Sequence, residues 1–81
     1  MSPGLQSLLA EAYDLAQVKQ NHIGAVASVK VALAKDDGLA KEAEAEGVRL
    51  AQVIAARGRG DHVSMVLNRI LTAALAKGDQ P

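Results

Sequence analysis

The sequence predicts an all-α fold, either a long antiparallel helical hairpin or a three-helix bundle, that is completed by oligomerisation. Apolar residues recur along it at the spacing of a helix face. The two prolines stand at positions 3 and 81, so none interrupts the chain between them. Residues 29–33 alternate as a strand does, but a lone strand would leave its backbone groups without partners. We therefore expect a single helical domain over residues 1–81.

The first element is expected to be one long helix over residues 4–35. Advancing by five turns, or about 18 residues, returns to the same helix face, and Leu5 and Leu15 map in this way onto Ile23 and Leu33. A continuous helix of this kind would be about 45 Å long. The Asn21–His22 pair and Gly24 mark the place where it would kink or break.

The second element is expected to be a helix over residues 38–57. Its apolar face comprises Leu39, Ala43, Leu50 and Ile54. Asp36 or Asp37 can cap its start. Gly47 lies near the apolar face, where a glycine costs about 1 kcal/mol relative to alanine. Its presence suggests that another helix approaches closely there.

The third element is expected to be an amphipathic helix over residues 62–77. Its apolar face comprises Val63, Val66, Leu67, Ile70, Leu71, Ala74 and Leu75. Asp61 is a suitable N-cap, Lys77 suits the negative end of the helix, and Gly78 suits a C-terminal cap. With turns at residues 36–38 and 58–60, the second and third helices are expected to run back along the first.

The apolar residues predict association with another chain. They make up 49% of the sequence but are mostly alanine, leucine and valine, and Tyr13 is the single aromatic residue. So lean a core would leave a small monomer marginally stable. A second copy or a helical protein partner would cover the apolar surface that the fold leaves exposed. This surface includes Val18, Val29 and Val48, which lie away from the main apolar stripes. The predicted interface residues are Leu5, Leu8, Leu15, Val18, Ile23, Val26, Val29, Ile70, Leu71 and Leu75.

Composition argues against several classes of protein. Nine basic and nine acidic residues give no net charge, and the absence of cysteine removes disulfides and thiolate metal sites. His22 and His62 have no metal-ligand spacing around them, and no serine or glycine motif of a known catalytic class is present. We expect no enzyme, cofactor or metal. No secretory signal or membrane-length apolar stretch is present, so a cytoplasmic location is expected.

We therefore expect a small helical protein–protein interaction module, such as an adaptor, a co-chaperone or an assembly subunit. The alternative is a nucleic-acid or phosphate-binding regulator that uses the turn at residues 57–60 and the start of the third helix, where glycines let backbone amides approach a phosphate. Its candidate residues are Arg57, Arg59, His62 and Arg69. Asp61 argues against this alternative, because its carboxylate already occupies the anion position at the helix start.

Overall fold

The computed structural model describes residues 1–76, apart from the side chain of Arg59. This range contains α1 (Pro3–Gln17), α2 (His22–Ala34), α3 (Asp37–Arg57) and α4 (His62–Leu75), with a short 3-10 helix, η1 (Gly58–Gly60), before α4. It contains no strand, so the predicted all-α class is confirmed. No helix within residues 1–76 is long and apolar enough to cross a membrane.

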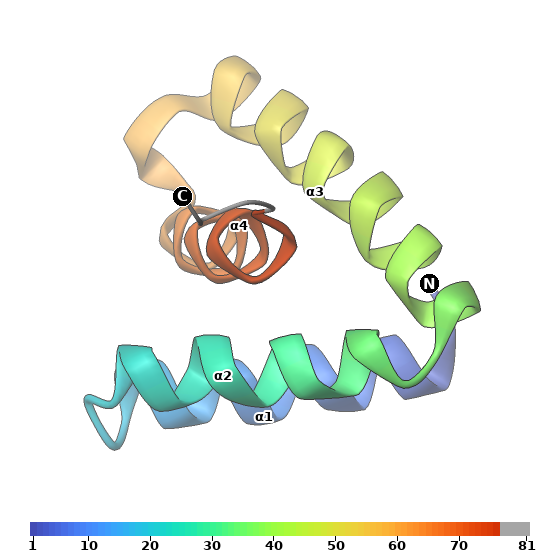
Figure 1. Cartoon of the computed structure of the whole chain (residues 1–81). Coiled ribbons are helices and arrows are strands. Elements are labelled where there is room, and N and C mark those ends of the chain that lie inside the picture. Colours follow the sequence, from blue (N-terminus) through green and yellow to red (C-terminus); the bar gives the residue numbers. More distant parts are fainter. Residues whose placement is uncertain (77–81) are drawn as a thin grey trace.

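The four helices form a compact globule around α4. α1 and α2 pair as an antiparallel hairpin, α4 crosses that hairpin, and α3 covers α4 from the opposite side (Figure 1). The Cα radius of gyration is 12.1 Å, close to the value of about 12 Å expected for a folded chain of this length. The predicted hairpin or three-helix bundle, with later helices running back along a long first helix, is therefore wrong.

The expected helix over residues 4–35 is broken between Gln17 and His22. Gln20 has a left-handed backbone conformation, with φ of 53°, and the N–H of Asn21 donates to the carbonyl of Leu15 at 2.9 Å. Asn21 then caps α2, since its side-chain oxygen accepts the N–H of Gly24 at 2.9 Å. The break lets the two halves of the apolar stripe pack against each other and against α4, which one straight helix cannot do.

α3 and α4 begin at aspartate caps. Asp36 Oδ1 accepts the N–H of Leu39 at 3.1 Å, and Asp61 Oδ1 accepts the N–H of Ser64 at 3.1 Å. Between the helices, Gly58 has a φ of 65°, a conformation that side chains disfavour. α4 ends at Leu75, and the expectations for Lys77 and Gly78 lie outside the described residues.

The core is buried by the chain itself. Its buried hydrophobic residues are Leu5, Leu9, Ala12, Ala25, Val29, Leu33, Ala43, Leu50, Val66, Ile70, Leu71 and Ala74. No leucine within residues 1–76 has an exposed side chain. The expectation that oligomerisation must complete the fold is therefore wrong. Small buried residues such as Ala25 and Ala43 let the helices approach closely, so that leucines fill the core without large aromatic rings.

Polar contacts connect α3 to the start of α1 and to α4. Ser2, the N-cap of α1, donates from Oγ to Glu42 Oε1 at 2.6 Å and from its backbone N–H to Oε2 at 3.2 Å. Asn68 Nδ2 on α4 donates to the carbonyl of Gly47 at 3.4 Å. A Cβ added to Gly47 would meet nothing within 4 Å. The expected close approach of another helix at this glycine is therefore wrong.

Candidate interaction surfaces

α2 is apolar on both of its sides, and one side faces outward. Its buried side consists of Ala25, Val29 and Leu33. The opposite side, which we call the outer face of α2, consists of Ile23, Ala27, Val31 and Ala34, and all four are exposed. The exposed fractions are 82% for Ile23 and 55% for Val31. A surface helix ordinarily carries polar residues on its outward side, so this face is unusual.

Charged residues border the outer face of α2 on two sides. Lys30, the one Lys, Arg, Asp or Glu residue in α2, lines a hollow toward α3 and α4 that Glu44 also lines. Toward α1, Ser28 shares a second hollow with Glu11 and Asp14. The face is thus an apolar stripe with charged groups at its borders, the usual composition of a protein interface.

The structure divides the ten predicted interface residues into three groups. Leu5, Val29, Ile70 and Leu71 are buried in the core; Leu8, Leu15, Val26 and Leu75 are half-buried; Val18 and Ile23 are exposed. Val29, expected to be left uncovered, has an exposed fraction of 0%, because the break before α2 turns this residue inward. Sequence reasoning missed Val31 as a surface residue, and the four-residue spacing of Ile23, Ala27 and Val31 was the signal that could have found it.

The arginine–glycine turn does not gather its predicted residues into one site. Arg57 Nη1 pairs with Asp61 Oδ2 at 3.5 Å. The pKa of Asp61 is lowered because the N–H of Ser64 donates to its carboxylate, with Arg57 adding to the effect. His62 Nε2 lies 2.8 Å from Gln17 Nε2. Arg69 lines a different surface, and the side chain of Arg59 is outside the described part.

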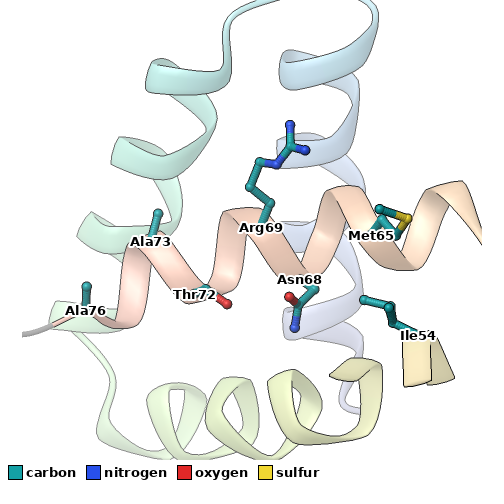
Figure 2. Close-up of a pocket in the computed structure, with 7 residues that line it drawn as sticks. All are labelled: Ile54, Met65, Asn68, Arg69, Thr72, Ala73 and Ala76. Atoms are coloured by element: carbon teal, nitrogen blue, oxygen red, sulfur yellow. The ribbon is translucent and has the colours of Figure 1, made fainter. Parts of the chain in front are cut away.

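Arg69 lines an open groove of about 590 Å³ between α3 and α4. We call it the α3–α4 groove, and it is lined by Ile54, Met65, Asn68, Arg69, Thr72, Ala73 and Ala76. In Figure 2, Arg69 rises from one edge of α4, while Asn68 and Thr72 lie along the other edge. Ile54 approaches from the α3 side near Met65. The groove is therefore largely apolar, with one cationic side chain.

α3 also carries a buried carboxylate, that of Glu46, which does not line the α3–α4 groove. Glu46 has an exposed fraction of 7%, and Arg49 donates to it from Nε at 2.9 Å and from Nη2 at 2.5 Å. These hydrogen bonds from Arg49 lower the pKa of Glu46. This pair is a structural contact within one helix. In the part of the chain that the structure describes, no three His, Asp or Glu side chains gather so as to hold a metal ion.

Comparisons with known proteins assign no family to this chain: no family model matches it, and no similar protein was found among curated proteins or solved structures. The outer face of α2 and the α3–α4 groove each offer a partner or ligand apolar contact together with nearby charge.

Proposed function

We propose that the protein is a helical protein–protein interaction module whose contact surface is the outer face of α2. The observation that carries this proposal is that a helix in an 81-residue protein is apolar on its solvent side as well as its core side. Exposed apolar stripes with polar borders typically mark interaction sites. The internal packing does not use this face, since Ala25, Val29 and Leu33 already supply the core contacts of α2.

The partner surface that fits best is the apolar side of another helix. Ala27 and Ala34 present little bulk, while Ile23 and Val31 project beyond them, which provides knobs and recesses for helix packing. A contact confined to these four side chains engages fewer residues than the roughly 20 to 30 per partner of a standard stable interface. We therefore expect a transient interaction rather than a permanent assembly.

The experiment places a photo-reactive amino acid at Val31 in one variant and at Val48 in another, in cells that express the protein. Val48 is a matched control because it is an exposed valine, 61% accessible, that lies on α3. We expect a discrete cross-linked adduct from position 31 and none from position 48. Adding Ile23→Asp to the Val31 probe should abolish the adduct.

Two outcomes would overturn this proposal. One is the absence of any discrete adduct from position 31, and the other is the same adduct from positions 31 and 48. The mass of the adduct distinguishes copies of the chain from another partner: whole multiples of the mass of the chain are expected for copies, and mass spectrometry of the excised adduct identifies any other partner. Ile23→Asp is not expected to unfold the chain, since the side chain of Ile23 lies largely in water.

A further inference from the structure

We propose that the α3–α4 groove binds a small aliphatic carboxylate, with the carboxylate at Arg69 and the hydrocarbon chain along α4. The site is separate from the outer face of α2, and it does not depend on the interaction proposed there. Two features of the groove carry the inference: its apolar lining, and the sign and position of its single charge.

The lining favours an apolar body. Ile54, Met65, Ala73 and Ala76 contribute hydrocarbon surface, and Thr72 and Asn68 add one hydroxyl and one amide at the edge toward α3. The amide of Asn68 is engaged with the carbonyl of Gly47 at 3.4 Å. An aliphatic chain laid on this surface removes apolar area from water on both partners.

The charge favours an acid. Arg69 is the one charged residue that lines the groove, and no Asp or Glu lines it. Among residues 1–76, the ion pairs are Arg49 with Glu46 and Arg57 with Asp61, so Arg69 has no carboxylate within 4.0 Å there. A guanidinium recognises a carboxylate through two parallel hydrogen bonds. Along α4 the lining of the groove extends from Met65 to Ala76, a rise of about 16 Å, which leaves room for an eight-carbon chain beside Arg69.

The volume of the groove suits a small molecule. Its volume of about 590 Å³ lies within the range of about 300 to 1,000 Å³ that is usual for small-ligand sites. The groove is open along one side, so we expect weak binding.

The test uses octanoate as the probe and 1-octanol as an uncharged probe with the same chain length. Methyl groups of isoleucine and methionine serve as NMR reporters, because the chain has them at few and well-separated places. These reporters are Met1, Ile23, Ile54, Met65 and Ile70. Octanoate should shift the Ile54 and Met65 signals and leave those of Ile23 and Ile70 in place.

Arg69→Gln should weaken octanoate binding about threefold, in keeping with an exposed charge pair, and should leave 1-octanol binding unchanged. Arg57→Gln is the matched control, since Arg57 does not line the groove, and it should leave both titrations unchanged. Added salt should weaken octanoate binding alone. An unshifted Ile70 signal in each variant shows that the core is intact.

Several outcomes would overturn the proposal. These are no shift at Ile54 and Met65, equal effects of octanoate and 1-octanol that Arg69→Gln does not change, and shifts at Ile70 that indicate loosening of the core. Shifts centred on Ile23 would also overturn it, because they would place the probe on the outer face of α2. Failure here leaves the cross-linking result at Val31 unaffected, so the two proposals fail separately.

Discussion

The side chain of Asn21 occupies the space that a side chain on Gly24 would need. Asn21 Oδ1 accepts the N–H of Gly24 at 2.9 Å, and a Cβ built on Gly24 would lie 2.8 Å from Asn21 Cγ. The helix cap and the glycine are therefore coupled: a side chain at position 24 would require the side chain of Asn21 to shift.

The coupling predicts different results for alanine at two helical glycines. Gly47→Ala should stabilise the protein by about 0.5 to 1 kcal/mol, because the added methyl group meets open space. Gly24→Ala should give no such gain, since it displaces the Asn21 cap, and a lost cap costs about 1 kcal/mol. Urea unfolding followed by circular dichroism measures both. In an Asn21→Ala background, Gly24→Ala should become stabilising, and an equal gain in both backgrounds would contradict the coupling.

Gln20 is expected to weaken the turn that it forms. Its φ of 53° lies in the left-handed region, where a residue with a Cβ is disfavoured by roughly 1 kcal/mol. Gln20→Gly should therefore raise the free energy of unfolding by up to about 1 kcal/mol, reduced by the greater freedom of glycine in the unfolded chain. Gln52→Gly, an exposed position inside α3, is the control and should destabilise by a similar amount. Destabilisation by both variants would show that Gln20 is unstrained.

The Glu46–Arg49 pair predicts a pH-dependent contribution to stability. The pKa of Glu46 is below its ordinary value of 4.5 because Arg49 donates hydrogen bonds to the carboxylate. The contribution is therefore fully present above about pH 4.5 and is lost as the pH falls through the lower pKa of the folded protein. At neutral pH, Glu46→Gln should destabilise by about 1 kcal/mol, since the carboxylate is buried but its partner is largely exposed.

The Glu46→Gln variant also tests the contribution of the Glu46–Arg49 pair at low pH. The unfolding curves of Glu46→Gln and the unchanged protein should converge as the solution is acidified, because the side chain at position 46 is then neutral in both proteins. Glu44→Gln serves as the control, since Glu44 is exposed, and it should change stability by less than about 0.5 kcal/mol. A difference for Glu46→Gln that stays constant down to strongly acidic pH would show that the ion pair does not contribute.

Substitutions of two isoleucines should distinguish a core position from a position on the outer face of α2. Ile70 has an exposed fraction of 0% and Ile23 one of 82%. Ile70→Val should destabilise by about 1 kcal/mol through the lost methylene group and the small cavity, whereas Ile23→Val should stay within about 0.5 kcal/mol. Thermal or urea unfolding gives both values. A comparable loss at Ile23 would mean that α2 is covered in solution by something that the isolated chain lacks.

A self-contained core predicts unfolding that does not depend on protein concentration. If folding required a second chain, dilution would lower the midpoint of thermal unfolding by mass action. Because the leucines within residues 1–76 are covered by their own chain, the midpoint should stay constant over a wide dilution series. A midpoint that falls with dilution would restore the requirement for oligomerisation.

Local signals predicted α3 and α4 better than the first half of the chain. Asp61 is the cap that the sequence predicted, and Asp36 is one of the two caps that it left open for α3, because capping depends on a few neighbouring residues. The first 35 residues were misjudged because a stripe of apolar residues can persist through a hairpin as well as through one helix. Asn21 followed three residues later by Gly24 was a local sign of a new helix start.

The binding surfaces were harder to predict, since they depend on how α2 is rotated. Val29 is buried and Val31 is exposed, although both fit a helical chain equally well. The break at residues 18–21 turns the buried side of α2 by about one residue, or about 100°, relative to a continuous helix. The α3–α4 groove likewise arises from residues on two helices, and no spacing within either helix reports how the two are placed.

The contact between Ser2 and Glu42 determines how the molecule can open. It joins residues 40 positions apart, so opening the first turn of α1 also breaks its contact with the first half of α3. Amide hydrogen exchange in that turn should therefore be slower than the rapid exchange that local fraying causes at helix ends.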